Sequence, residues 1–232
     1  MTTRRPLPPG HTLRPLAADD LPALHRLNAD VMRALPDAGM FKLFGGAERF
    51  LADHLGPRGE SLGAFADGRL VAYGSLTRPA APDLDNYATD LGWPPERAGR
   101  VALLSAAMVE PAYRGRGLHR ALIDARIALA RDLGVPELLV RSAPANERSR
   151  RTLLGHGFAL VWLGVQREGS LRHVFWRPIE GAAWTAPADA DGALAWVAVD
   201  QLERQKELLR DGWIGVRMRE GASAIGFARR ER

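Results

Sequence analysis

One stretch of this 232-residue chain constrains its fold most strongly: an apolar run that leads into a glycine-rich turn and a helical pattern. Residues 101–109 read VALLSAAMV without a charge, which is typical of a strand buried on both faces. The turn YRGRG follows at residues 113–117. From Leu118 to Leu133 apolar residues recur at intervals of three and four, which predicts a helix stopped by Gly134. Strand, turn and helix in this order form one unit of a mixed α/β fold.

The glycine-rich turn has the local chemistry of a phosphate site. The first N–H groups of a helix lack intrahelical partners, and the helix dipole places about half a positive charge there. Glycine lets an anion approach the backbone, and Arg114, Arg116 and Arg120 add charge-assisted donors. A lone Gly-x-Gly is a weak signal, because it lacks both the Gly-Lys-Ser/Thr and the G-x-G-x-x-G patterns. The alternative is a helix that merely begins at glycine in an arginine-rich protein.

The other elements follow from periodicity and turn chemistry. Asp19 or Asp20 can begin a helix that carries leucines at helical spacing. Asp67-Gly68 joins two apolar runs, which predicts a β-hairpin. The expected elements are a strand at 11–16, that helix from 21, a broken helical region at 28–58, the hairpin at 61–77, a 23-residue loop at 78–100 with a short helix near 84–91, a strand at 137–142, a helix at 146–154, and a second hairpin at 158–166 and 171–179.

Four regions are predicted along the chain. They are a disordered tail at 1–10, a domain at 11–179, a linker at 180–193 and a small β-α-β-β unit at 194–232. In the unit we expect a strand at 195–199, a helix at 201–211 that Asp200 and Glu203 begin as a capping box, and a hairpin at 213–218 and 222–228. The whole is an α/β (mixed α+β) fold: a central mixed sheet flanked by helices, with this C-terminal appendage.

The C-terminal unit is too small to be stable alone, so its apolar face needs a partner surface. That surface belongs either to the preceding domain or to a second chain, which makes a homodimer possible.

Composition excludes several classes. Cysteine is absent, so disulfides and thiolate metal sites are excluded, and we expect no metal. The net charge is +5, but all 32 basic residues except Lys42 and Lys206 are arginine, and they are spread among 27 acidic residues. This pattern is typical of a GC-rich bacterial genome and disfavours a nucleic-acid surface. No signal sequence or membrane span is visible, so we expect a cytoplasmic protein with no membrane partner.

Two motifs resemble a known family. AMVEPAYRGRGLHRALI, at residues 107–123, resembles motif A of the GNAT superfamily of N-acyltransferases: a strand ending in V-x-P, followed by Arg-x-x-Gly-x-Gly at a helix start. APANERSRRTLLGHGF, at residues 143–158, resembles motif B, an Asn-initiated helix that ends in Gly-Phe. The resemblance covers roughly residues 11–179 and implies an acetyl-CoA-dependent N-acetyltransferase of the GNAT fold.

The resemblance also implies which residues bind acetyl-CoA, the co-substrate. The strand edge would hydrogen-bond the pantetheine arm, the turn would hold the pyrophosphate, and the motif B helix start would contact either group. The implied residues are Ala107, Met108, Val109, Arg114, Gly115, Arg116, Gly117, Leu118, His119, Arg120, Asn146 and Ser149. Arg150 and Arg151 either reach the adenosine phosphate or form a solvated helix face.

The sequence departs from the family at the positions for acid–base chemistry. Ser105 stands where many members carry a Glu, and Leu153 stands where many carry a Tyr. His119 replaces a small residue, and either donates to phosphate or points outward. Ser105 and Glu110 are our catalytic candidates, with Glu110 alternatively a solvated strand end. Further substitute bases are Asp83, Asp85, Asp90, Tyr113 and His156.

The long loop suggests the acceptor. Asp85, Tyr87 and Asp90 combine carboxylates with an aromatic ring in a basic protein, which suits a cationic amine. A polar loop over the sheet is the alternative. As a hypothesis, the C-terminal unit at 194–232 packs near the acceptor side. We therefore expect transfer of an acetyl group to a primary amine by direct attack. The alternative, which Ser105 and Leu153 motivate, is a non-catalytic acyl-CoA-binding or sensing domain.

Overall fold

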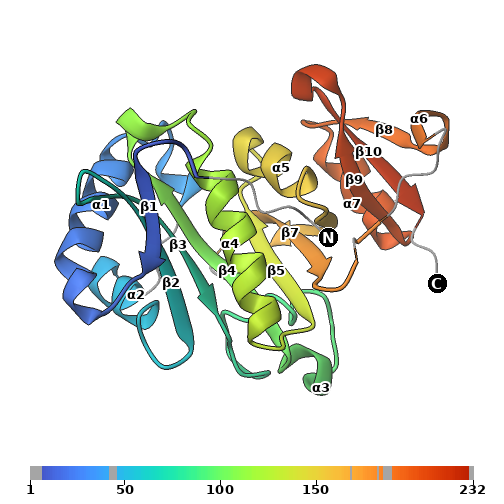
Figure 1. Ribbon diagram of the computed structural model, residues 1–232. Coiled ribbons are helices and arrows are strands. Elements are labelled where there is room, and N and C mark those ends of the chain that lie inside the picture. The colour runs from blue at the N-terminus through green and yellow to red at the C-terminus, as the bar shows by residue number, and fades with distance from the viewer. Residues whose placement is uncertain (1–6, 42–45, 168, 182, 185–189, 230–232) are drawn as a thin grey trace.

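The computed structural model describes residues 7–41, 46–167, 169–181, 183–184 and 190–229. Within these residues, ten strands form one sheet in the order β1-β2-β3-β4-β5-β7-β6-β9-β10-β8 (Figure 1). The strands are β1 (His11–Pro15), β2 (Gly59–Ala66), β3 (Arg69–Thr77), β4 (Val101–Val109), β5 (Glu137–Ser142), β6 (Ala159–Val165), β7 (Leu171–Pro178), β8 (Ala195–Ala198), β9 (Trp213–Met218) and β10 (Ala224–Arg229). The pairings are antiparallel except for β4 with β5, so the predicted mixed α/β class is confirmed.

The α-helices lie between and over the strands. They are α1 (Leu21–Arg33), α2 (Ala47–Asp53), α3 (Pro95–Ala98), α4 (Leu118–Asp132), α5 (Glu147–Leu154), α6 (Ala190–Ala193) and α7 (Leu202–Arg210). Short 3-10 turns occur at η1 (Ala18–Asp20), η2 (Ala38–Met40), η3 (Pro111–Tyr113) and η4 (Glu220–Ala222). Within the described residues, every helix is too short or too polar to cross a membrane.

The β2–β3 hairpin confirms the Asp-Gly prediction. Asp67 and Gly68 have φ of 48° and 73°, and two left-handed positions in succession match the twist of the flanking strands. At the other edge of β3, the pairing with β4 shifts between Ser75 and Thr77. Thr77 lies opposite Leu103 and Ser75 opposite Ala106, so β4 carries one extra residue there, a β-bulge.

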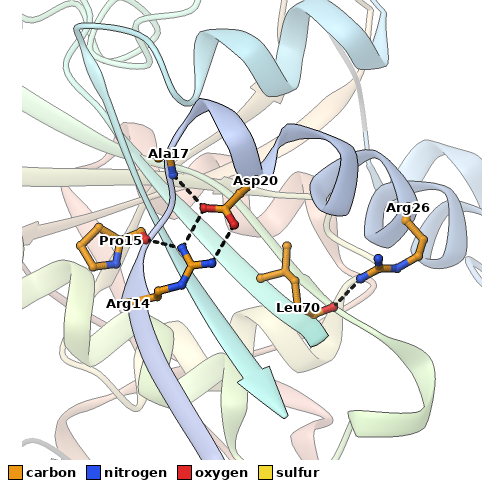
Figure 2. Close-up of polar contacts among 6 residues, drawn as sticks. All are labelled: Arg14, Pro15, Ala17, Asp20, Arg26 and Leu70. Atoms are coloured by element: carbon orange, nitrogen blue, oxygen red, sulfur yellow. Dashed lines mark hydrogen bonds and ion pairs between the residues drawn. The ribbon is translucent and has the colours of Figure 1, made fainter. Parts of the chain in front are cut away.

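The junction between β1 and α1 is fixed by an ion pair (Figure 2). Arg14 donates to both oxygens of Asp20, at 2.8 and 2.7 Å, and Asp20 also accepts from the N–H of Ala17 at 2.9 Å. Farther along α1, Arg26 donates to the carbonyl of Leu70 on β3 at 3.4 Å. Asp20 is thus the residue before α1, as predicted, but its side chain serves the preceding turn rather than α1.

The two faces of the sheet are covered differently. On one face, Ile123 and Ile127 of α4 share an apolar cluster with Leu104 of β4 and Val140 of β5. On the other face, Tyr87 and other residues of the long loop pack on Leu103, Leu139 and Val174. Neighbouring strand residues point to opposite faces, so the loop and α4 lie on opposite sides of β4 and β5.

The long loop differs from the prediction in one element. Residues 84–91 form successive turns instead of a helix, and the helix of this loop is α3. The buried side chain of Asn86 explains the difference, because its amide donates to the carbonyls of Ala80 and Ala98, 3.0 Å each. A side chain that bonds the backbone in this way competes with helix formation.

The C-terminal unit extends the sheet within the same chain. Gly215 of β9 pairs with Leu160 of β6, and Val197, Leu208 and Phe227 join the apolar cluster beneath α4 and α5. In Figure 1 the unit, in orange and red, lies beyond β7 and beside α5. Its apolar face is therefore covered by its own chain, next to α5. Its placement near the acceptor side stays a prediction. The division into two domains and the homodimer stay predictions.

One smaller prediction about the C-terminal region is wrong, the capping box at the start of α7. Gln201, not Asp200, precedes α7, and Glu203 pairs with Lys206 at 2.7 Å, so the capping box is absent. The predicted linker ends in a short helix, α6, and residues 182 and 185–189 of it lie outside the described part. Most of the predicted N-terminal tail, residues 1–6, also lies outside it.

Candidate functional site

The strand β4 has one edge that is only partly paired. Its parallel pairing with β5 covers Val101–Leu103, opposite Glu137–Leu139. Its antiparallel pairing with β3 continues to Val109. Beyond Leu103 the recorded partners of β4 lie on the β3 side, so its last residues present backbone groups on the β5 side. Such an edge offers alternating N–H and C=O groups to an extended ligand.

The glycine turn lies directly after that edge. Gly115 and Gly117 have φ of 80° and 88°, a left-handed backbone that other residues rarely adopt. A Cβ added at either glycine would meet no atom within 4 Å, so the turn borders open space. The first α4 hydrogen bond runs from the N–H of Ala121 to Gly117, so the N–H groups of residues 118–120 precede it. The turn therefore presents backbone donors, with positive helix-dipole potential, to the outside.

The arginines of this turn are not equally available. Arg114 donates through Nε to the carbonyl of Val109 at 3.3 Å, which ties the turn to the end of β4. Arg116 donates to the carbonyl of Ala112 at 3.2 Å, and its guanidinium lies 4.9 Å from the ring centroid of Tyr113. Arg120 is exposed in the first turn of α4. Arg114 therefore positions the turn, and Arg120 extends toward solvent.

His119 lies among cationic neighbours. Desolvation, followed by Arg126 and His156, lowers the pKa of His119 to about 3. The residue keeps part of its surface exposed, but its ring is neutral at physiological pH. In this state an N–H of the ring can donate to an anion without carrying a charge.

The start of α5 confirms the predicted cap. The Oδ1 atom of Asn146 accepts from the N–H of Ser149 at 3.1 Å. This bond leaves the amide NH₂ group as the donor with which Asn146 can contact a ligand. The neighbouring Arg150 is buried and donates to the carbonyl of Pro144, so the solvated helix face is wrong for this residue, and its phosphate contact stays a prediction. Arg151 is half-exposed and pairs with Glu147 at 2.9 Å.

The two catalytic candidates have different surroundings. The hydroxyl of Ser105 bonds that of Thr77 on β3, and Ser105 is partly exposed at the bulge of β4. The carboxylate of Glu110 forms an ion pair with Arg69, so it is not a solvated strand end. Leu153, at the position where many relatives carry Tyr, is buried in the apolar core. The structure thus brings Ser105 to the open edge of β4 and leaves Leu153 without acid–base chemistry.

Two of the three acceptor candidates are engaged with the rest of the fold. Tyr87 is buried, and the guanidinium of Arg141 lies 4.9 Å from its ring centroid. Asp90 accepts from the amide of Gln166, in the connection between β6 and β7. Asp85 is exposed. The loop is therefore fixed on the sheet. For Tyr87, the alternative of a polar loop that covers the sheet fits better than contact with an acceptor amine.

Sequence reasoning missed Arg126, the largest fully buried side chain. Its position four residues after Leu122 places it on the buried stripe of α4, and that spacing was the signal that could have identified it.

The comparisons with known proteins agree with this geometry. Residues 22–158 match the model of the Acetyltransferase (GNAT) family. That span is more than half of the chain, and the chain belongs to this family. A search among curated proteins finds no match.

Solved structures share the fold at low sequence identity. The ribosomal-protein-S18-alanine N-acetyltransferase from Escherichia coli superposes with a TM-score of 0.54 and 19% identity, covering 76% of this chain and 99% of that one. NAA60 from Arabidopsis thaliana in complex with acetyl-CoA gives 0.54 and 18%, covering 74% and 99%. The protein yncA from Salmonella typhimurium with acetyl-CoA gives 0.55 and 18%, covering 75% and 97%. At these identities the likeness shows the fold.

Proposed function

We propose that this protein transfers an acetyl group from acetyl-CoA to a primary amine by direct attack. The observation that carries the proposal is the open edge of β4, followed at once by the left-handed glycine turn and the start of α4. The edge suits the amide-bearing pantetheine arm, and the N–H groups of the turn suit the pyrophosphate. Acetyl-CoA in the complexes of two structural neighbours supports the same assignment.

The reaction needs little from side chains. The amine nitrogen attacks the thioester carbonyl carbon, a C–N bond forms, and the C–S bond breaks. Coenzyme A leaves as the thiolate and takes up the proton that the amine loses. Positioning can supply effective molarities of ~10⁵ M or more, whereas general acid–base catalysis typically contributes ~10² to 10⁴ in rate. Transfer is therefore compatible with Ser105 and Leu153 at the positions of the usual acid–base pair.

A thiol-release assay with a panel of amines tests the proposal. The panel combines small amines, amino acids and peptides with free N-termini, and acetyl-CoA turnover is followed against an amine-free control. We expect turnover with at least one class of primary amine. Tight coenzyme A binding without turnover on any amine would instead support the alternative, an acyl-CoA sensor, which the buried Leu153 favours.

A further inference from the structure

A fully buried arginine lies at the centre of α4. Arg126 is 1% exposed, and its recorded hydrogen bonds all go to backbone carbonyls. Its Nε donates to Leu122 at 3.1 Å, while its Nη1 donates to both Ser75 of β3 at 3.1 Å and Ala106 of β4 at 2.9 Å. Burying a guanidinium is costly, and burial lowers the pKa of Arg126 to about 9. A residue that is costly to bury needs an explanation beyond filling space.

The fold makes room for this guanidinium. A Cβ on Gly74 would lie 2.8 Å from both Cζ and Nε of Arg126, so the missing side chain of Gly74 accommodates the arginine. Gly74 lies opposite Ala107, directly beside the bulge of β4. Arg126 therefore bonds the sheet at the point where β4 becomes irregular and has left β5.

The two carbonyl contacts fix the direction of one peptide group. A single nitrogen within 3.1 Å of both oxygens requires the carbonyls of Ser75 and Ala106 to point into the space between β3 and β4. In a trans peptide the N–H points opposite to the C=O. The N–H of Ala107, which belongs to the same peptide group as the carbonyl of Ala106, therefore points toward β5 and the open edge.

We propose that Arg126 is a positioning residue for acetyl transfer: its guanidinium clamps the Ala106–Ala107 peptide so that the Ala107 N–H faces the acyl-CoA. The proposal rests on the proposed function, since it concerns the same edge of β4. A charged donor on the carbonyl also polarises the peptide, which strengthens its N–H as a donor. Arg126 reaches the substrate only through this backbone, because its hydrogen bonds go to Leu122, Ser75 and Ala106 and not to the turn at Gly117.

Substitutions at Arg126 separate positioning from cofactor binding. We expect Arg126→Met to lower kcat at least tenfold while the KM for acetyl-CoA stays within threefold, because the pyrophosphate turn is retained. Arg126→Lys keeps the charge but loses the fork that bridges two carbonyls, so its kcat should be intermediate. Arg131→Met is the matched control, since Arg131 lies on the same helix, is half-exposed and pairs with Glu180. Its kinetics should equal those of the native chain.

A double-mutant cycle keeps the test decisive if Arg126→Met folds poorly. Gly74→Ala displaces the guanidinium without removing its charge, so it should lower kcat in the native background. In the Arg126→Met background the same change should have a much smaller effect. Additive effects, or a folded Arg126→Met with kcat less than tenfold below native, would overturn the proposal. A native chain that turns over no amine would refute the proposed function itself.

Discussion

The open edge of β4 and the long loop that packs on β4 and β5 are neighbouring regions, but they are built in different ways. At β4 and the glycine turn, the candidate ligand contacts are backbone groups whose direction is set by strand alternation and by two left-handed glycines. On the opposite face, candidate residues already have partners inside the protein: Asp83 pairs with Arg58 and Asp90 with Gln166. A site made of backbone groups can therefore be identified from a short motif, whereas a site made of side chains depends on partners far along the chain.

Of all the changes, removal of the C-terminal unit should lower stability most. It affects the part of the sheet that carries α4 and α5, where the cofactor site lies. Deleting residues 180–232 uncovers the apolar cluster that α4 and α5 share with Val197, Leu208 and Phe227. We expect an insoluble or unfolded product, measured by expression and circular dichroism. Phe227→Ala, within the full chain, should cost about 3–5 kcal/mol of unfolding free energy in a denaturant titration. A soluble truncated protein with native stability would contradict the shared core.

Binding of acetyl-CoA at the glycine turn should be sensitive to the charge of the residue at position 117 rather than to its shape. At ligand one hundred times the native dissociation constant, acetyl-CoA should stabilise the native chain by about 2.7 kcal/mol. Gly117→Asp places a carboxylate against the pyrophosphate and should remove most of that stabilisation in a thermal-shift series. Gly117→Asn is the matched control, since Asn tolerates the left-handed backbone and carries no charge. Equal losses in both variants would show that strain, not charge, governs the turn.

The hydroxyl at the open edge should matter little. Ser105→Ala removes the bond to Thr77 but not a usable base, so kcat should fall less than tenfold. Thr77→Val breaks the same bond from β3 and should give a similar result. A hundredfold loss confined to Ser105→Ala would assign Ser105 a direct catalytic role.

Substitutions in the long loop should differ in their effect on the KM for the amine. Asp90→Asn weakens the link to Gln166 and should raise the KM for the amine about fivefold, the size of a partly exposed charge contact. Asp85→Asn alters an exposed carboxylate and should change that KM less than twofold. A larger effect at Asp85 than at Asp90 would place the amine at the outer surface of the loop.

A change remote from both regions should affect only stability. The hydrogen bond from Arg14 outweighs desolvation and lowers the pKa of Asp20 to about 2 (Figure 2). Because the pKa of Asp20 is lower in the folded state, its ionised carboxylate stabilises the protein at pH values above the unfolded-state pKa, near 3.9. This stabilisation is lost as the pH falls toward 2. Asp20→Asn should cost at most about 1 kcal/mol at pH 7, since Arg14 is half-exposed, and the difference should shrink below pH 4. Turnover at neutral pH should not change.

The sequence predicted most strands and the two large helices of the site, but it misjudged elements that side chains organise. The α4 helix and its glycine start follow from spacing and backbone preference alone. The turns at 84–91 could not be foreseen, because the amide of Asn86 bonds carbonyls up to twelve residues away. For Glu110 and Arg150 the solvated alternative was wrong, since Arg69 and the carbonyl of Pro144 meet them only in the folded chain.

The sequence by itself determined where the backbone turns and which residues begin the helices of the site. Asp67-Gly68, Gly117 and Asn146 act through their own φ angles or through neighbours within three residues. Only the tertiary structure decided that β4 leaves β5 after Leu103 and that Arg126 bonds the bulge. These features depend on contacts between residues 20 to 51 positions apart, which periodicity and local propensity do not encode.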